Sequence, residues 1–311
     1  MPSFEKGLVE LGEGLHAYLL PDGSWGLSNA GLIQGEGASL LVDTLFDLRL
    51  TREMLDAMDP LTSRAPIATL VNTHANGDHC WGNQLVGGAE VIASKATAEE
   101  MSRVTPAMMR MMVSVDFGPV LTPYLRERFG LFDFDGIEVP PPTRTFDGRI
   151  DLEVGGRRVE VIEVGPAHTD GDTLVHVPDA RTVFTGDILF IGGTPIVWAG
   201  PVRNWVAACD RILALDAETI VPGHGPLSDR RGVEAVKRYL EFVWREASER
   251  KRAGMSALEA ARDIELGEYA DWGASERIVV NVDSIYRELD PQHPPANVLG
   301  LFLQMAEMAK R

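Results

Sequence analysis

The segment Asn72-Thr73-His74-Ala75-Asn76-Gly77-Asp78-His79 directly follows the apolar run 68–71, which predicts a short buried strand. Between His74 and His79 this segment carries two imidazoles, a carboxylate and a carboxamide. Neutral imidazole nitrogen and carboxylate oxygen are ligands that divalent ions such as Zn²⁺ prefer. The segment therefore predicts one half of a metal site, and the other ligands have to come from elsewhere in the chain.

Three other β-branched runs are each followed closely by a residue of the same kind: 159–164 by His168, 181–185 by Asp187, and 219–221 by His224. Strand ends in layered α/β proteins carry functional loops on a rigid scaffold, so these residues are expected to meet at one edge. The candidate metal ligands are therefore His74, Asp78, His79, His168, Asp187 and His224.

The order of these residues resembles the metallo-β-lactamase superfamily, whose pattern is a His-x-His-x-Asp-His loop, a lone histidine, a bridging aspartate and a final histidine. The resemblance runs from about residue 15 to about residue 230. It implies an α/β fold, a four-layer αββα sandwich with two mixed sheets packed face to face between helices. The ligands that it implies are His74 and His168 for a first metal position, Asp78, His79 and His224 for a second position, and Asp187 as the bridge between them.

The loop departs from the family pattern at Asn76, which stands where the family has its second histidine. A carboxamide oxygen is a weak and neutral ligand for zinc, so the first position loses a good donor while the second keeps all of its ligands. We expect one tightly bound Zn²⁺ in the second position, with Asp187 as fourth ligand, and a first position that is weak or empty. Iron and manganese are the alternative metals. An alternative role for Asn76 is to hold substrate or to orient water.

The remaining histidines and a cysteine near the loop have simpler interpretations. His16 and His176 lie within alternating apolar runs, which indicates packed strand residues. Cys80 directly follows the metal loop. Because adjacent side chains diverge, we expect a buried free thiol there rather than a metal ligand.

Length and composition favour one catalytic unit with an appendage. The chain has 311 residues, and a sandwich of this kind occupies most of that length. Its two cysteines cannot form a disulfide framework, and the first residues contain neither a basic leader nor an apolar segment of signal-peptide length. No run approaches the about 20 apolar residues of a membrane span. We therefore expect a cytoplasmic protein that does not engage a membrane.

The formal net charge of −17 comes from 46 acidic and 29 basic residues spread along the chain. Such a field repels polyanions, and no basic cluster with interleaved aromatic residues compensates for it. The charge favours a small-molecule substrate over nucleic acid, although surface acidity that serves only solubility is the alternative explanation.

The periodicity outside the metal loop predicts a mixed fold. Strands are expected at 16–20, 29–33 and 39–43 as an antiparallel meander, and another strand is expected at 90–93. A helix is expected at 48–58, where Pro60 ends it, and a further helix is expected to open at Trp81.

Residues 95–142 contain five methionines followed by aromatic residues, and a triple proline closes the segment. Methionine is unbranched and polarizable, so it suits adaptable apolar pockets. We interpret this segment as a helical, lid-like insertion over the metal, with Met108 and Met112 as candidate pocket residues. Ordinary helix packing and a dimer contact are the alternatives.

The segment after Asp187 carries two indoles, Trp198 and Trp205. If they face the pocket, they can stack on a flat or aromatic substrate. The alternative for Trp205 is that it begins a helix at 205–215 and packs this helix onto the sheet.

The domain organisation follows from these patterns. Residues 1–230 are expected to form the catalytic domain, including the insertion at 95–142. Residues 231–311 read as a helical C-terminal extension packed on that domain, with helices expected at 233–249, 257–264, 277–289 and 296–308. A homo-oligomer interface is an alternative role for this extension.

The predicted site defines a reaction type. A metal lowers the pKa of a bound water from about 15.7 toward about 7, and the resulting hydroxide attacks an electrophilic centre. Asp78, or Asp187 if it is not a strong ligand, takes and returns the proton, and Asn76 lies beside them. The leading hypothesis is a metal-dependent hydrolase that acts on a small, largely apolar ester, lactone, thioester or amide.

Three alternatives keep the same residues. The Asn-bearing loop, the methionine-rich insertion and the two tryptophans also resemble the hydrolytic dehalogenase for chlorothalonil, in which hydroxide displaces chloride from an activated aromatic ring. An iron-dependent sulfur dioxygenase-like oxidoreductase is a further alternative, although its glutathione substrate favours basic residues near the site, and the sequence locates none. The third is a binding protein without catalysis.

Overall fold

The computed structural model describes residues 3–310. One sheet has seven strands in sequence order: β1 (Gly7–Gly12), β2 (Leu15–Leu19), β3 (Ala30–Gln34), β4 (Ser39–Val42), β5 (Ile67–Val71), β6 (Glu90–Ser94) and β7 (Arg144–Phe146). Strands β1 to β4 form the expected antiparallel meander, and β4 to β7 run parallel. The parallel half points the carboxyl ends of β4 and β5 at the same edge.

The second sheet has five strands in the order β12-β11-β10-β9-β8. Their bounds are β8 (Arg149–Val154), β9 (Arg157–Glu163), β10 (Thr173–Val177), β11 (Thr182–Phe184) and β12 (Thr219–Val221). The pairing is antiparallel except between β11 and β12, which are parallel. The strands that precede Asp187 and His224 therefore end side by side.

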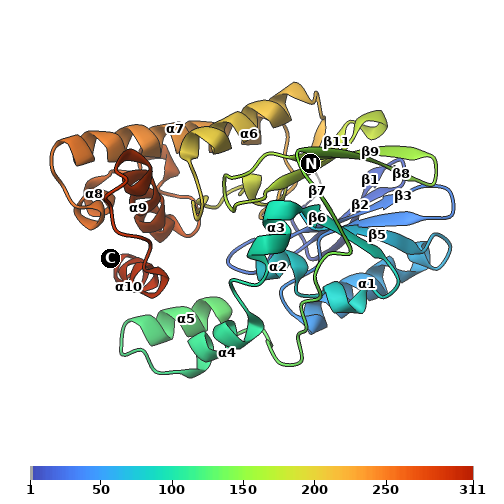
Figure 1. Cartoon of the computed structure of the whole chain (residues 1–311), viewed down its shortest axis with the longest axis horizontal. Helices are drawn as coiled ribbons and strands as arrows, with labels where there is room; N and C mark the ends of the chain where they lie inside the picture. Colours follow the sequence, from blue (N-terminus) through green and yellow to red (C-terminus); the bar gives the residue numbers. More distant parts are fainter. Residues whose placement is uncertain (1–2, 311) are drawn as a thin grey trace.

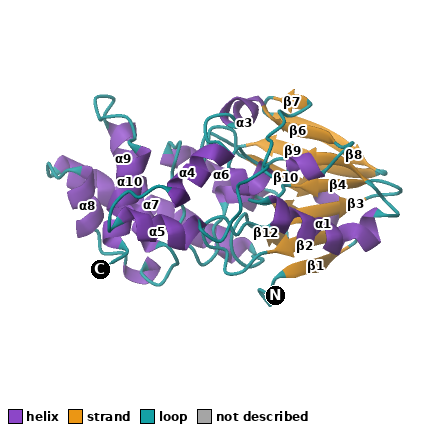
Figure 2. Ribbon diagram, turned by 90° about the horizontal axis from the view of Figure 1, so that it is seen from below, coloured by secondary structure: helices purple, strands orange, loops and turns teal. Residues whose placement is uncertain are grey.

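Alternation along the strands builds two apolar layers. One set of alternating residues, including Ile33, Val161 and Phe184, forms a buried core between the sheets. Residues on the opposite faces, such as Leu41 and Ile220, pack with the helices instead. The predicted αββα sandwich is confirmed, and Figure 2 shows the strands gathered at one end of the molecule and most of the helices at the other.

The helices are α1 (Leu48–Thr62), α2 (Gly77–Cys80), α3 (Lys95–Glu100), α4 (Pro106–Ser114), α5 (Leu121–Phe129), α6 (Val202–Ala214), α7 (Arg230–Arg252), α8 (Ala257–Asp263), α9 (Ile278–Leu289) and α10 (Val298–Met308). Short 3₁₀ turns are η1 (Asn83–Leu85), η2 (Pro178–Ala180), η3 (Gly186–Ile188), η4 (Gly267–Tyr269) and η5 (Ser275–Arg277).

Several predicted helix boundaries were wrong, and α7 extends three residues beyond its predicted range of 233–249 at each end. Helix α1 continues through Pro60 to Thr62, because a proline in the last turn removes only one helical hydrogen bond. No helix opens at Trp81; the helical turn α2 lies inside the metal loop and begins at Gly77, and Trp81 follows its end. Helix α6 begins at Val202, before Trp205.

The insertion and the C-terminal helices pack against each other. The rings of Phe129 in α5 and Phe302 in α10 lie 6.0 Å apart, edge to face. The hydroxyl of Tyr124 in α5 donates to Oε1 of Glu276 in η5 over 2.9 Å. In Figure 1, α4 and α5 lie beside α10, and α6 and α7 run along the opposite side. Residues 95–142 and 231–310 therefore cover one end of the sandwich together.

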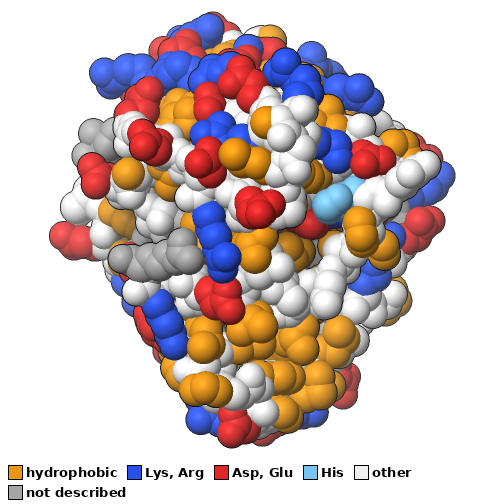
Figure 3. Space-filling view, turned by 90° about the vertical axis from the view of Figure 1, so that its left-hand side faces the viewer, with side chains coloured by type: hydrophobic (Ala, Val, Ile, Leu, Met, Phe, Trp, Pro, Cys, Tyr) orange, Lys and Arg blue, Asp and Glu red, His pale blue; other side chains and the backbone are white. Residues whose placement is uncertain are grey.

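The helical end carries mixed charge and some exposed apolar surface. Figure 3 shows Lys and Arg side chains interspersed with Asp and Glu above a region of apolar side chains. Among the exposed apolar residues are Met108 and Met111 of α4 and Val298 of α10. Among the described residues, no helix combines the length and the apolar character needed to cross a bilayer.

Candidate metal centre

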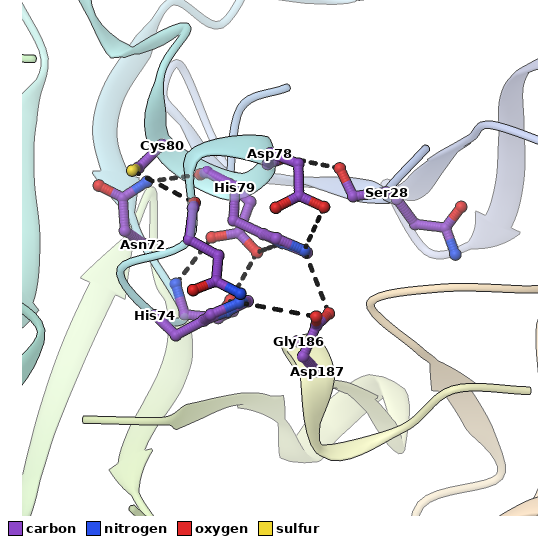
Figure 4. Close-up of polar contacts among 12 residues, drawn as sticks. Ser28, Asn72, His74, Asp78, His79, Cys80, Gly186 and Asp187 are labelled. Carbon is purple, nitrogen blue, oxygen red and sulfur yellow. Dashed lines mark hydrogen bonds and ion pairs between the residues drawn. The ribbon is translucent and has the colours of Figure 1, made fainter. Parts of the chain in front are cut away.

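The six predicted ligands lie together at one edge of the sandwich. They form two groups whose ligand atoms lie within 4.8 Å of one another: His74, His168 and Asp187, and Asp78, His79 and His224. His74 follows β5, Asp78 and His79 lie on α2, and the other three follow β9, β11 and β12. Figure 4 shows the Asp187 carboxylate pointing toward the imidazoles of the metal loop.

Asp187 lies between the two groups. Its Oδ2 is 3.3 Å from Nε2 of His168 and 3.4 Å from Nε2 of His224. Its Oδ1 is 3.1 Å from Nε2 of His79. The arrangement therefore gives this carboxylate contact with both groups, which is what the family resemblance implies for a bridging ligand.

Two observations test whether a divalent metal fits these residues. Nε2 of His74, Nε2 of His79 and Oδ1 of Asp187 are buried atoms that make no hydrogen bond of good geometry in the structure, although the last two lie 3.1 Å apart. Gly223 leaves room for the carboxylate, because a Cβ at this position would lie 2.0 Å from Oδ1 of Asp187. Ligand-type atoms that face one another and lack partners fit a bound cation, since unpaired buried polar atoms are costly.

The charges of the site point the same way. Burial alone raises the pKa of Asp187, but the imidazoles of His224, His79 and His74 outweigh burial and hold that pKa well below its usual value. Burial lowers the pKa of His224, but Asp187 and Asp78 raise it to about 9. Positive charge thus stabilises the buried carboxylates at this point, and a divalent cation would supply that charge.

A supporting residue that the sequence analysis missed is Asp43, directly after β4. Its Oδ2 lies 2.9 Å from Nδ1 of His79, and it also accepts from the backbone N–H and the hydroxyl of Thr73, each over 2.7 Å. This contact fixes the His79 ring so that Nε2 faces Asp187. The available signal was that Asp43 ends an apolar run at the same edge as the metal loop.

His168 is oriented from a different direction. Its Nδ1 donates to the carbonyl oxygen of Ile196 over 2.7 Å, which leaves Nε2 as the free acceptor. The loop that carries Ile196 is held by Asn281 of α9, whose side chain accepts from Val197 N and donates to Pro195 O. The C-terminal extension therefore positions a candidate ligand of the first metal position.

Asn76 lies beside the first position. Its Nδ2 is 2.9 Å from Nε2 of His168, the nitrogen that faces the site. In this arrangement the amide occupies the lone pair that a metal needs, so Asn76 competes with an ion in the first position. Among the described residues, no side-chain amide contacts the ligand atoms of the second position, Asp78, His79 and His224, in this way.

The pocket candidates differ in their placement. Trp205 has no exposed surface, packs 5.7 Å from the His168 ring and donates from Nε1 to Ile188 O, so it supports His168 from behind. Trp198 is partly exposed, and its backbone N–H donates to His168 O over 3.2 Å. Met108 is 45% exposed on α4, and Met112 is partly buried. Pocket roles for Trp198, Met108 and Met112 stay predictions.

The residues interpreted as non-ligands lie outside the two groups. His16 and His176 are buried strand residues, and Nδ1 of His176 lies 3.1 Å from Oε2 of Glu160. Cys80 is a buried free thiol, as predicted. The thiol donates to the backbone oxygen of Asn76.

Aromatic side chains pack beside the candidate ligands. The ring of Phe190 stacks on that of His224 at 5.0 Å. On the side of His168, Trp198 lies 6.2 Å from Phe302, and Phe302 lies 5.7 Å from Trp25. We call Trp25, Phe190, Trp198 and Phe302 the aromatic wall.

Comparison with known proteins identifies the family. The model of the metallo-beta-lactamase superfamily matches residues 23–224. The chain belongs to this superfamily. The matched segment contains all six candidate ligands and ends at His224.

Two relatives share part of the chain. The alpha subunit of a 2,4-dinitroanisole O-demethylase from Nocardioides sp. (strain JS1661) is 27% identical over 211 residues, which are 65% of this chain and 54% of that protein. A linear primary-alkylsulfatase from Pseudomonas sp. (strain ATCC 19151) is 26% identical over 235 residues, 67% of this chain and 43% of that protein. The chain spans about half the length of these relatives.

Among solved structures, a stereoselective inverting sec-alkylsulfatase from Pseudomonas sp. matches with a TM-score of 0.70 at 18% identity. The match covers 91% of this chain and 50% of that one, so it must include more than half of residues 231–311. The alkylsulfatase thus shares the fold of both the sandwich and much of the helical extension.

Proposed function

We propose that the chain is a metal-dependent hydrolase of a small, largely apolar substrate with an ester, lactone, thioester or amide bond. The observation that carries the proposal is the convergence of two ligand groups on Asp187, with buried ligand atoms that lack partners. A zinc ion in such a site supplies Lewis-acid activation of water and of the group under attack.

The protein residues divide the remaining work. Asp43 and the carbonyl of Ile196 hold His79 and His168 in fixed orientations, so the site needs little rearrangement during a reaction. Asp78 is the better placed of the two carboxylates to move a proton, because its side chain is 12% exposed whereas that of Asp187 is 3% exposed.

The aromatic wall supports the substrate class. Phe190 packs against the rings of His168 and His224, and Trp198, which packs on Phe302, is joined to His168 through its backbone, so the surroundings of these candidate ligands are apolar, which favours an acyl, alkyl or aryl body over a sugar or a nucleotide. The alkylsulfatase relative accords with an apolar alkyl group.

A second candidate is displacement of a leaving group from an electron-poor aromatic ring by water. It is favoured by one observation, the similarity to a 2,4-dinitroanisole O-demethylase subunit over 65% of the chain. Release of chloride from a chlorinated aromatic nitrile, or of methanol from 2,4-dinitroanisole, without turnover of esters would support this candidate and displace the first.

The first experiment is elemental analysis of protein purified without chelator, paired with hydrolysis of 4-nitrophenyl acetate. We expect about one zinc per chain, loss of metal and activity in His79→Ala, and a rise toward two metals in Asn76→His. His176→Gln is the control, because His176 is a buried histidine outside both groups. Two metals in the unchanged protein would contradict the proposed role of Asn76, and iron with oxygen uptake would contradict hydrolysis.

A further inference from the structure

Arg277 is a buried arginine beside the aromatic wall. It is 3% exposed, and its guanidinium lies between two rings, 4.1 Å from the centre of Trp25 and 5.3 Å from that of Phe190. Nη1 donates to the carbonyl oxygen of Thr194 over 2.8 Å. Within residues 3–310, no carboxylate pairs with this guanidinium, since the neighbouring Glu276 is engaged by Tyr124 and Arg128.

Unsatisfied polar groups gather around Arg277. Nε of Arg277, Nε1 of Trp25 and Oγ1 of Thr194 are all buried and have no hydrogen-bond partner in the described part of the chain. Two of these groups are obligate donors, and the hydroxyl of Thr194 can donate as well. A buried cation surrounded by unused donors is costly for a folded chain, and a ligand that brings acceptors and negative charge relieves that cost.

This cluster is continuous with the candidate metal centre. Arg277 contacts Phe190, whose ring stacks on His224 and lies 5.6 Å from that of His168. On the other side, the ring of Trp25 packs against that of Phe302, which in turn packs against that of Trp198. Burial lowers the pKa of Arg277, while Glu276 and Tyr124, and to a smaller extent Asp187 and Asp78 of the metal centre, raise it. The guanidinium therefore lies within electrostatic reach of the metal centre.

We propose that Arg277, Trp25 and Thr194 form an oxyanion subsite that binds a sulfate or carboxylate group of the substrate. The inference rests on the proposed function and narrows its substrate class to an apolar body that carries one anionic group. The aromatic wall holds the apolar body, and the donors of the subsite hold the anion. Arg277 acts here as a specificity-determining residue, because it selects the substrate without contacting the metal ligands.

The sequence alone did not place Arg277 near the site. Arg277 lies in η5 of the C-terminal extension, beyond the family match that ends at residue 224. The residue follows no motif, so only the fold brings it to the aromatic wall.

Binding is measured first, because it does not depend on turnover. The probes are hexyl sulfate, hexanoate and the neutral hexanol, titrated by calorimetry into the protein as purified. We expect at least one anion to bind the unchanged protein about tenfold more tightly than Arg277→Met, and hexanol to bind both equally. The tighter of the two anions distinguishes a sulfate from a carboxylate subsite. An anion that binds only through the metal would retain its affinity in Arg277→Met and overturn the proposal.

Two further variants protect the test against misfolding. Trp25→Phe keeps an aromatic ring, although a smaller one, and removes the Nε1 donor, so it should weaken anion binding several-fold in a folded protein. This variant decides the test if Arg277→Met fails to fold. Arg128→Met is the matched control, because Arg128 also lies over an aromatic ring, at 5.2 Å from the centre of Tyr124, but pairs with Glu276. Its anion affinity should stay unchanged. Equal anion affinity in unchanged protein and folded Trp25→Phe and Arg277→Met would overturn the subsite.

Hydrolysis separates the two proposals. Mono-4-nitrophenyl succinate and 4-nitrophenyl acetate differ in one carboxylate, and the preference for the succinate, measured as a ratio of kcat/KM values, should fall about tenfold in Arg277→Met. Anion binding without hydrolysis of either ester would keep the subsite and contradict the hydrolase. Hydrolysis of both esters with equal efficiency by unchanged protein and Arg277→Met would keep the hydrolase and contradict the subsite.

Discussion

Asp43 shows how a residue outside the ligand set controls the site. Its carboxylate accepts from the backbone N–H and hydroxyl of Thr73 and lies 2.9 Å from Nδ1 of His79. Asp43 adopts a left-handed backbone conformation, with φ of 62°, which aspartate tolerates better than most residues. Asp43, at the end of β4, thus contacts both Thr73 near the start of the metal loop and His79 at its end.

We expect Asp43→Asn to weaken metal binding by about 10–100-fold while the chain stays folded, because the amide cannot accept all of these donors. Competition with a chelator measures the affinity. The control is Asp47→Asn, where the buried Asp47 caps α1 by accepting from Leu50 N over 2.7 Å. That change should cost little stability, because asparagine caps a helix about as well as aspartate does, and it should leave metal affinity unchanged. Equal losses of affinity in both variants would contradict the orienting role of Asp43.

We expect His16 to make the free energy of unfolding depend on pH. It lies in β2 with its Nδ1 buried and unpartnered, and burial lowers its pKa despite the opposing effects of Glu10 and the Gly14 backbone. As pH falls, the unfolded chain takes up the proton first, near pH 6.5, so the folded state loses stability below that pH. In His16→Gln the free energy of unfolding should fall less between about pH 7.5 and pH 5.5. Urea titrations at both values measure it, and identical losses would refute the assignment.

The element that carries Asp78 and His79 depends on close packing. Helix α2 begins at Gly77, and the ring of Trp81 lies against it, stacked on Phe46 at 5.2 Å. The helix expected to open at Trp81 begins instead at Gly77, within the metal loop. Packing of Trp81 against Phe46 and Phe134 instead supports a helical turn within the loop.

Gly77→Ala tests this packing. A Cβ on Gly77 would lie 2.4 Å from the Trp81 ring, and Trp81 is buried and cannot yield easily. We expect a loss of about 1–3 kcal/mol of stability and weaker metal binding. Gly87→Ala is the control, because a Cβ there meets nothing within 4 Å, and its effect should stay within about 0.5 kcal/mol. Denaturant unfolding and chelator competition measure both, and a neutral Gly77→Ala would show that α2 is free to shift.

The strands that lead to the candidate ligands were predictable, because β5, β9, β11 and β12 carry β-branched residues and each is closely followed by a ligand-type residue, whereas β1, β7 and β8 were not predicted. Those strand ends were enough to predict that His74, His168 and His224 meet. Asp43 and Arg277 escaped prediction for a physical reason: their roles come from contacts between elements far apart in sequence. The end of α1 was also predicted wrongly, because a proline is tolerated in the last turn of a helix and α1 continues past Pro60.

At the scale of the whole molecule, the C-terminal extension is part of the candidate site. Gly273 pairs with the loop at 192–194, and Asn281 holds Pro195 and Val197 of the same loop. That loop supplies the carbonyl of Ile196 to His168. The sandwich alone therefore does not fix the first metal position, because one of its histidines is oriented by a loop that the extension holds.

Asn281→Ala should therefore act on the metal centre from a distance. The side chain is 1% exposed, accepts from Val197 N over 2.8 Å and donates to Pro195 O and to the hydroxyl of Tyr239. Its removal leaves these groups unsatisfied, and we expect a loss of about 2–4 kcal/mol of stability, given about 1–3 kcal/mol for each buried group left unpaired. The loop should loosen, so the His168 ring loses its fixed orientation. Cobalt substitution in an Asn76→His background, in which the first position is expected to fill, reports this change through the visible spectrum of the bound ions in the folded protein.

Tyr239→Phe is the matched control for Asn281→Ala. It removes only the hydroxyl that Asn281 contacts and keeps both hydrogen bonds to the loop. It should lower stability by about 1 kcal/mol and leave the cobalt spectrum unchanged. If both variants changed the spectrum equally, the cause would be general destabilisation. A change confined to Asn281→Ala would establish that the extension controls the metal centre through the loop.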